Sequence, residues 1–201
     1  MIRVLLAEDQ TMVRDAIASL LALEEDVEVV GQVGRGDEVL DAARAARPDV
    51  ALLDIEMPGA SGLDAAAALH AELPETRILI LTTFGRPGYL RRAMETGAVG
   101  FLLKDAPGAE LAQAIRRAMA GDKVVDPGLA AEALSEGESP LTTREREVLA
   151  RAREDGTIAD IAASLHLSPG TTRNHLSAIM GKLDARSRIE AIRIAEEKGW
   201  L

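Results

Sequence analysis

The sequence predicts an α/β fold, a (βα)5 doubly wound parallel sheet, followed by a small all-α helix-turn-helix domain. Two patterns predict the sheet. Short apolar runs alternate with stretches of helical apolar spacing, and each run is short enough to be a strand buried on both faces. From residue 140 onward only helical patterns occur. We therefore expect a sheet domain over residues 1–120, a linker over 121–139 and a helical domain over 140–201.

Five apolar runs are the expected strands, and a helix is expected after each of them. The strands are Ile2–Ala7, Val27–Val30, Val50–Leu53, Ile78–Leu81 and Val99–Leu103. Apolar residues at helical spacing predict the helices Met12–Leu23, Glu38–Ala46, Leu63–Leu73, Pro87–Thr96 and Pro107–Met119. Pro48, Pro74 and Gly97 are typical of helix ends. Gly, Pro and Glu then break the periodicity over residues 121–139, which suits a linker with a helical part around Leu129–Leu134.

The last part of the chain has the pattern of a helix-turn-helix. Thr142 and Glu145 have the spacing of a capping box. A short helix is expected over Ile158–Leu165, a turn over His166–Ser168, and a longer helix over Pro169–Leu183, with the preceding serine as its cap. The second helix of such a pair can lie in the major groove of DNA.

Composition limits the classes of function. The chain has no cysteine, which excludes disulfides, zinc–thiolate sites and cysteine nucleophiles. No apolar stretch reaches the ~18 residues of a membrane span, and the chain starts directly into a strand. We therefore expect no signal peptide, no membrane insertion and a cytoplasmic protein. The net charge of −10 is uneven, −11 in residues 1–139 and +1 in residues 140–201. A local basic patch there suits phosphate, although such a patch is as often a solvated face.

Side chains able to hold a metal or a phosphoryl group follow four of the expected strands. Glu8 and Asp9 follow the first strand, Asp54 the third, Thr82 the fourth and Lys104 the fifth. The carboxyl ends of parallel strands meet at one edge of a sheet, so these residues are expected to lie together. Three carboxylates at one edge repel one another, and a hard cation such as Mg²⁺ relieves this repulsion.

Asp54 is the expected phosphoryl acceptor in this cluster. Catalysis of phosphoryl transfer is mainly positioning and charge neutralisation, for which Lys104 offers a point charge and Thr82 a hydroxyl. Each residue alone has an ordinary explanation: acids at strand ends cap helices, Thr83 could serve in place of Thr82, and Phe101 is core by default. The five polar residues together favour chemistry.

These motifs resemble those of a known family. Residues 1–120 resemble a response-regulator receiver domain in Ala7-Glu8-Asp9, Leu53-Asp54-Ile55-Glu56-Met57-Pro58-Gly59, Leu81-Thr82-Thr83 and Leu102-Leu103-Lys104-Asp105. Residues 140–201 resemble the helix-turn-helix of the NarL/FixJ (LuxR-type) class in Leu141-Thr142-Thr143-Arg144-Glu145-Arg146-Glu147-Val148-Leu149 and Ser168-Pro169-Gly170-Thr171-Thr172-Arg173-Asn174-His175. A finer resemblance is to the DesR-like regulators of lipid-desaturase genes, in runs such as Arg86-Pro87-Gly88-Tyr89 and Glu197-Lys198-Gly199-Trp200.

The resemblance implies a two-component response regulator. Asp54 would take a phosphoryl group from a phosphohistidine of a sensor histidine kinase, of a membrane-linked type by the DesR-like resemblance. Mg²⁺ would be held by Asp9, Asp54 and the backbone carbonyl of Glu56, and by Glu8 through water. The chain would then be no enzyme beyond its own phosphoryl transfer and dephosphorylation.

The resemblance also implies a switch. Lys104 would pair with the phosphate, Thr82 would move toward it, and Phe101 would be the buried aromatic partner whose position reports the state. Glu56 and Phe84 would influence the lifetime of the phosphorylated form. Phosphorylation would favour a homodimer, for which the first and last receiver helices are candidate faces. Ala112, Ile115 and Met119 could form an apolar seam there, although any core-facing helix shows the same spacing.

The output resemblance assigns residues to double-stranded DNA. Base-facing roles fall on Arg173, Asn174 and Ser177, and phosphate contacts on Ser168, Thr171, His175 and Lys182. Arg173 can read guanine and Asn174 adenine. Family members often carry a basic residue at the position of Ser177, and His175 could equally be an ordinary surface histidine.

Two other classes of protein share part of this pattern. A magnesium-dependent phosphohydrolase also places an aspartate nucleophile at a sheet edge, but it needs an acid–base aspartate where Glu56 stands, and it leaves the helix-turn-helix unexplained. A receiver-only adaptor fits the acidic first half but not Arg173 and Asn174 on a capped helix. The expected function is therefore phosphorylation-controlled transcription regulation.

Overall fold

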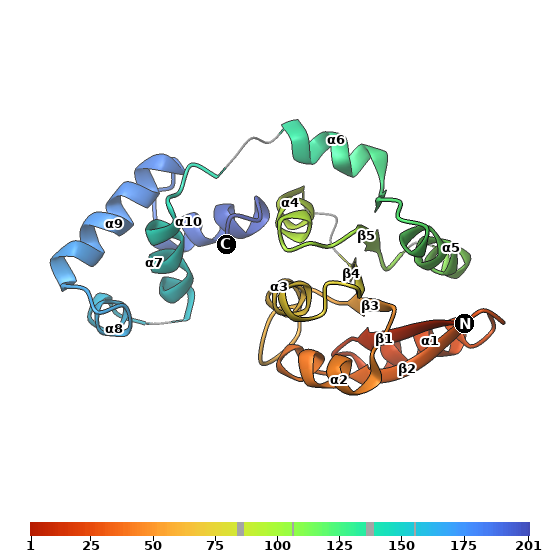
Figure 1. The fold of residues 1–201 in the computed structure, drawn as a ribbon. Helices are drawn as coiled ribbons and strands as arrows, with labels where there is room; N and C mark the ends of the chain where they lie inside the picture. The colour runs from red at the N-terminus through yellow and green to blue at the C-terminus, as the bar shows by residue number, and fades with distance from the viewer. Residues whose placement is uncertain (84–86, 106, 136–138, 155) are drawn as a thin grey trace. The chain divides into compact units, whose positions relative to one another are not determined.

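A parallel six-stranded sheet is the centre of the first of two compact units (Figure 1). The first unit comprises Met1–Gly85 and Leu90–Ala131, and the second comprises Arg86–Tyr89 and Glu132–Leu201. The computed structural model describes residues 1–83, 87–105, 107–135, 139–154 and 156–201. The strand order is β2-β1-β3-β4-β5-β6. The strands are β1 (Ile2–Ala7), β2 (Val27–Val33), β3 (Val50–Leu53), β4 (Arg77–Thr82), β5 (Gly100–Leu103) and β6 (Val124–Val125). The predicted α/β fold with a parallel sheet is confirmed.

Helices lie on both faces of this sheet (Figure 1). They are α1 (Thr11–Leu21), α2 (Val39–Ala46), α3 (Gly62–Glu72), α4 (Pro87–Glu95) and α5 (Gly108–Met119). Apolar residues of α1 and α5, such as Ile17 and Ile115, share one buried cluster with Val4, Leu6 and Leu79 of the strands. Helices α2 and α3 pack against each other on the opposite face. The strands are therefore covered on both sides, which explains their continuous apolar runs.

The structure corrects the predicted element list in the first unit. Five strands were expected, but the expected linker contains a sixth strand, β6, which pairs Gly100 with Val124 and Phe101 with Val125. A two-residue strand is too short to show a period in the sequence. Helix α6 (Pro127–Ser135) covers the helical part expected around Leu129–Leu134. A 3₁₀ turn, η1 (Gly36–Glu38), precedes α2 and replaces the start of the expected second helix. The exact limits of the domains and linker stay predictions.

Four helices share the apolar core of the second unit. They are α7 (Thr143–Glu154), α8 (Ile158–Ser164), α9 (Pro169–Lys182) and α10 (Arg188–Glu197). Val148, Ile161 and Ile179 are fully buried in their common core. The turn between α8 and α9 passes through His166 at φ 53°, and the Ser168 side chain accepts a hydrogen bond from the Thr171 N–H at 3.0 Å. The expected helix-turn-helix and its serine cap are present.

Membrane insertion was not expected from the sequence. Among the residues that the structure describes, no helix is both long and apolar enough to cross a bilayer.

Candidate functional site

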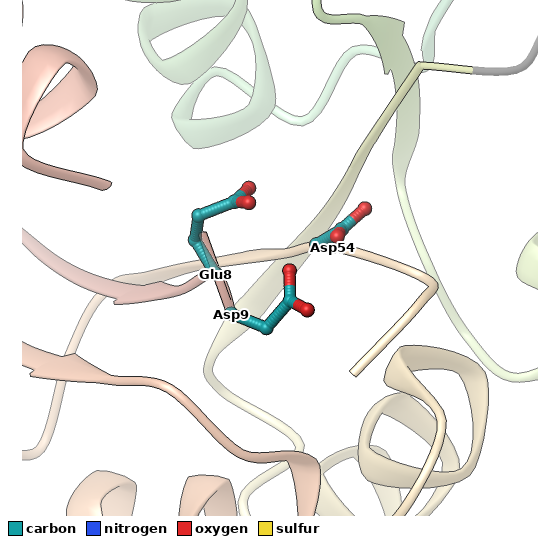
Figure 2. A group of neighbouring side chains, drawn as sticks. All are labelled: Glu8, Asp9 and Asp54. Carbon is teal, nitrogen blue, oxygen red and sulfur yellow. The ribbon is translucent and has the colours of Figure 1, made fainter. Parts of the chain in front are cut away.

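Three carboxylates meet at the carboxyl edge of the sheet. Glu8 and Asp9 follow β1, Asp54 follows β3, and one carboxylate oxygen of each lies within 4.8 Å of the others. Figure 2 shows the Glu8 and Asp9 side chains leaving adjacent positions of the chain, with Asp54 beside them. Glu8 and Asp54 are buried, at 1 % and 5 % exposure, while Asp9 is exposed. The pairing of Ala7 with Leu53 places the two strand ends side by side, so the parallel register assembles the cluster.

Lys104, which follows β5, completes the cluster. Its Nζ lies 2.6 Å from Glu8 Oε2 and 3.1 Å from Asp54 Oδ2, and only 9 % of its side chain is exposed. Burial lowers the pKa of Lys104, but the hydrogen bonds and charges of Glu8 and Asp54 outweigh burial and raise it overall. Lys104 therefore remains an ammonium group between two buried carboxylates.

Burial has the opposite effect on the acceptor carboxylate. Desolvation raises the pKa of Asp54 from 3.8 to about 6, although the charge and hydrogen bond of Lys104 oppose this rise. The Ile55 N–H donates to Asp54 Oδ1 at 2.8 Å and fixes the orientation of the side chain. Gly62 opens α3 against the backbone of Asp54: a Cβ on it would lie 1.8 Å from the Asp54 carbonyl oxygen, so only glycine lets the loop after β3 close this tightly.

The other residues expected at this edge occupy distinct places. Thr82 ends β4 beside Leu103, is 1 % exposed, and its carbonyl accepts from the Lys104 N–H at 2.8 Å. Phe101 is 2 % exposed and pairs with Ile80 on one side and Val125 on the other. Glu56 lies exposed in the loop after β3. Phe84 falls outside the described residues. The structure thus brings Glu8, Asp9, Asp54 and Lys104 together and keeps Phe101 in the core.

The donor set fits a hard divalent cation. Mg²⁺ prefers carboxylate oxygens and water, and it binds through one or two carboxylates plus phosphate oxygens. Asp9 is exposed, whereas Glu8 is held by Lys104 and by the Gln10 N–H, which donates to Glu8 Oε1 at 3.2 Å. An accessible acid beside two buried ones is therefore available for an incoming ion.

Sequence reasoning missed one arginine beside this cluster. Arg14 of α1 donates from Nη1 to the carbonyl oxygen of Glu8 at 2.5 Å. Its place on the partly polar side of an amphipathic helix carries no sequence signal for this contact. The contact depends on where α1 returns over the end of β1, which only the tertiary structure shows.

The second candidate site lies on α9. One side of α9 is buried against the other helices, and its residues recur at helical spacing: Thr172, Leu176, Ile179 and Leu183. The opposite side of α9 carries the residues expected to face bases, and all three are exposed: Arg173, Asn174 and Ser177. Ser168 and Thr171 at the start of the helix are exposed as well, and His175 is half-buried. The arrangement can present polar side chains to a major groove.

Lys182 has a partner that the sequence did not predict. Its Nζ lies 2.6 Å from Glu145 Oε2, and the same oxygen accepts from the Thr142 N–H at 2.7 Å. The Glu145 N–H in turn donates to Thr142 Oγ1 at 3.2 Å, so the expected capping box is present. Burial raises the pKa of Glu145, but Lys182 and Thr142 outweigh it and lower the pKa overall. Lys182 ties the end of α9 to the start of α7, and its phosphate contact stays a prediction.

The apolar seam considered on the last receiver helix is not available as a surface. Ala112 and Ile115 are buried at 2 % and 0 % exposure in the core of the first unit, while Met119 is 40 % exposed. The spacing of these residues reflects packing of α5 on its own sheet. Exposed apolar residues lie instead on α1, where Met12 is 83 % and Leu20 44 % exposed.

An acidic cluster with a lysine at a parallel sheet edge, joined in one chain to a helix-turn-helix, defines the class of two-domain response regulators. Comparison with protein families agrees. Residues 4–116 match the response regulator receiver domain, and residues 139–195 match the bacterial regulatory proteins of the luxR family. The chain belongs to the NarL-type (LuxR) family of two-component response regulators, with a receiver domain and a LuxR-type DNA-binding domain.

Similar proteins share this organisation over their full length. The chain is 48 % identical over 100 % of both chains to the uncharacterized transcriptional regulatory protein YvfU of Bacillus subtilis. It is 47 % identical to the transcriptional regulatory protein DesR of Bacillus subtilis, covering 100 % of this chain and 99 % of that one. Among solved structures, the response regulator ChrA of a heme-sensing two-component system has a TM-score of 0.57 at 33 % identity, covering 100 % and 98 %. These relatives are regulators and not classical enzymes.

Proposed function

We propose that Asp54 accepts a phosphoryl group from a phosphohistidine of a sensor histidine kinase and that this event controls sequence-specific DNA binding. One observation carries the proposal: Asp54 is a buried carboxylate within ion-pair distance of Lys104 and beside Glu8 and Asp9. A buried anion whose pKa is raised to about 6 is poorly solvated, and it gains from bonding to an electrophile.

The transfer exchanges one bond for another. An Asp54 oxygen forms a bond to phosphorus while the phosphorus–nitrogen bond to the kinase histidine breaks, and the imidazole leaves with the electron pair. Bound Mg²⁺ would neutralise charge on the phosphoryl oxygens. Asp9, Asp54 and the backbone carbonyl of Glu56 would hold it, with Glu8 acting through water. Lys104 supplies the remaining positive charge, because its ammonium already lies 3.1 Å from Asp54.

The same groups provide a two-state switch. Phosphorylation adds charge to a site that Lys104 now shares between Glu8 and Asp54, so Lys104 and the Thr82 hydroxyl gain a new partner. Thr82 moves toward the phosphoryl oxygen, and buried Phe101 takes the space behind it. New contacts that exist in only one arrangement shift a pre-existing equilibrium toward that arrangement.

Receiver pairing is the proposed result of the shift. An apolar groove of about 290 Å³ lies between α1 and α5, and Met12, Leu20, Leu111 and Lys104 are among the residues that line it. Lys104 thus belongs to both the acidic cluster and the wall of this groove. A second copy of the receiver would cover the exposed apolar residues of α1, and pairing of two DNA-binding domains raises affinity through effective concentration.

DNA binding is assigned to α9. Arg173, Asn174 and Ser177 would face bases, while Ser168, Thr171, His175 and Lys182 would contact phosphates. A regulator that binds chromosomal DNA and accepts a phosphoryl group from a kinase works in the bacterial cytoplasm.

The test is DNA binding to genomic fragments, with and without acetyl phosphate and Mg²⁺, for the wild type and Asp54→Ala. The proposal expects the donor to tighten binding of the wild type alone. Equal binding in all four conditions would reject Asp54 as the switch while leaving DNA binding intact.

Pairing is tested separately by sedimentation of the phosphorylated protein. Met12→Glu places a charge on the α1 surface and is expected to keep the protein monomeric. Met12→Leu preserves an apolar side chain and is expected to dimerise as the wild type does. Dimerisation of Met12→Glu at wild-type strength would place the interface elsewhere.

A further inference from the structure

Arg14 of α1 contacts the backbone from which two of the three carboxylates project. Its Nη1 donates to the carbonyl oxygen of Glu8 at 2.5 Å, and its Nη2 lies 3.4 Å from Thr11 Oγ1. That carbonyl belongs to the peptide bond that joins Glu8 to Asp9. A hydrogen bond from a charged donor is stronger than one between neutral groups. Arg14 therefore restrains the peptide that sets the direction of both side chains.

A glycine leaves the room that this guanidinium needs. A Cβ on Gly34 would lie 3.1 Å from Arg14 Nη1 and 3.9 Å from the Glu8 carbonyl oxygen. The first of these distances is tighter than ordinary van der Waals contact. Gly34 is not among the glycines with positive φ, so its backbone conformation does not require glycine. Space for Arg14 is thus a separate reason for the small residue at this position.

The pairing of β1 with β2 places Gly34 beside Glu8, and so close to the side chain of Arg14. The Glu8 N–H donates to the Val33 carbonyl at 3.1 Å, which extends the β1–β2 pairing by one residue beyond Ala7. Beyond this point the Glu8 carbonyl accepts from the Arg14 side chain. The hydrogen bond from Arg14 therefore comes directly after the last β1–β2 hydrogen bond, at the residue where the acidic cluster begins.

We propose that Arg14 is a positioning residue of the Mg²⁺ site, and that Gly34 makes room for it. This inference rests on the proposed function, because it requires the cluster of Glu8, Asp9 and Asp54 to bind Mg²⁺. The guanidinium fixes the Glu8–Asp9 peptide by its hydrogen bond and so holds the directions of the Glu8 and Asp9 side chains before the ion binds. Loss of a group that orients metal ligands typically weakens metal binding by about 10–100-fold.

The experiment titrates Mg²⁺ into the full-length protein by isothermal titration calorimetry. Arg14→Gln and Gly34→Ala are each expected to weaken Mg²⁺ binding by about tenfold, the second without removing the arginine. Arg3→Gln is the matched control. Arg3 also donates from Nη2 to a backbone carbonyl, that of Ala46 at 2.6 Å, but it lies at the other end of β1. Its loss is expected to leave Mg²⁺ affinity within about twofold of the wild type, since it touches no metal ligand.

Phosphorylation by acetyl phosphate provides a second measurement. In Arg14→Gln the Mg²⁺ concentration for half-maximal rate is expected to rise about tenfold, while the rate at saturating Mg²⁺ stays within about twofold. General damage to the fold would instead lower the rate at every Mg²⁺ concentration. Arg14→Lys keeps the charge but shortens the donor, so a positioning role predicts Mg²⁺ affinity close to that of Arg14→Gln.

The Mg²⁺ affinities of these variants distinguish a positioning role of Arg14 from a purely structural one. Wild-type Mg²⁺ affinity in Arg14→Gln or in Arg14→Lys overturns the positioning role, as does equal weakening in Arg3→Gln. If Arg14→Gln fails to fold by circular dichroism, Gly34→Ala and Arg14→Lys decide. A wild type that shows no Asp54-dependent Mg²⁺ binding overturns the proposed function itself, and the role of Arg14 with it.

Discussion

Replacing Asp54 by asparagine is expected to stabilise the metal-free protein. Burial raises the pKa of this carboxyl from 3.8 to about 6, so the ionised form is disfavoured in the folded state despite its contact with Lys104. At ~1.4 kcal/mol per pKa unit, the difference corresponds to roughly 3 kcal/mol. The amide also loses part of the hydrogen bonding to Lys104. We therefore expect Asp54→Asn to raise the free energy of unfolding by roughly 1–3 kcal/mol at about pH 7.5.

The pH dependence of this gain follows from the sign of the shift. The folded pKa lies above the unfolded value, so the folded protein holds the Asp54 proton more tightly. Between about pH 4 and pH 6 the unfolded chain releases this proton first, and wild-type stability falls as the pH rises. Asparagine has no proton to release. The advantage of the variant is therefore small near pH 4, grows through this window and is constant above it.

Urea unfolding in the presence of EDTA measures the effect. Far-ultraviolet circular dichroism reports both units, and Trp200, the single tryptophan, packs on the core of the second unit and reports that unit by fluorescence. The gain is expected in the transition of the first unit alone. Asp15→Asn, which removes a charge from the exposed side of α1, is the control and is expected to change little. A variant no more stable than the wild type, or a gain independent of pH, would refute the reasoning.

Three further outcomes are expected. Lys182→Ala removes an ion pair to buried Glu145, so we expect the free energy of unfolding of the second unit, followed by Trp200 fluorescence, to fall by about 1–2 kcal/mol. Because Lys182 is proposed to contact phosphate, we also expect the salt slope of DNA binding to fall by about 1. Gly62→Ala forces a methyl group to 1.8 Å from a backbone carbonyl, and we expect a loss of at least about 3 kcal/mol in urea unfolding, well above ordinary substitutions. Arg173→Ala removes an exposed side chain from α9, and we expect specific DNA binding in a competition assay to weaken by about 1–3 kcal/mol while the free energy of unfolding stays unchanged. If binding to unrelated DNA weakens to the same extent, Arg173 contacts phosphates and not bases.

Local patterns explain why most of the first unit could be predicted from the sequence. A strand buried on both faces is a continuous apolar run, so β1 and β3 begin and end where these runs do. Parallel strands share a carboxyl edge, and residues that follow separate runs could be expected to meet there. The cluster of Glu8, Asp54 and Lys104 is such a case, because topology alone brings these three residues together.

Short and distant contacts could not be predicted in the same way. The strand β6 has two residues, and its pairing with β5 depends on the path of the chain after α5. Lys182 and Glu145 are 37 positions apart, and a lysine beside other basic residues in the sequence indicates phosphate contact rather than an ion pair. Ile115 has the spacing of both a core residue and an interface residue, and only packing against the sheet distinguishes the two.

The sequence by itself determined the order of the five longer strands and of the helices that follow them, the acids and lysine at the strand ends, and the caps of α7 and α9, because these depend on residues near one another in the chain. The tertiary structure decided which of these groups are buried and which are paired. The raised pKa of Asp54, the contact of Arg14 with the Glu8 carbonyl and the ion pair of Lys182 each require two segments to close on one another. Desolvation and hydrogen bonding depend on that closure, and a linear pattern does not contain it.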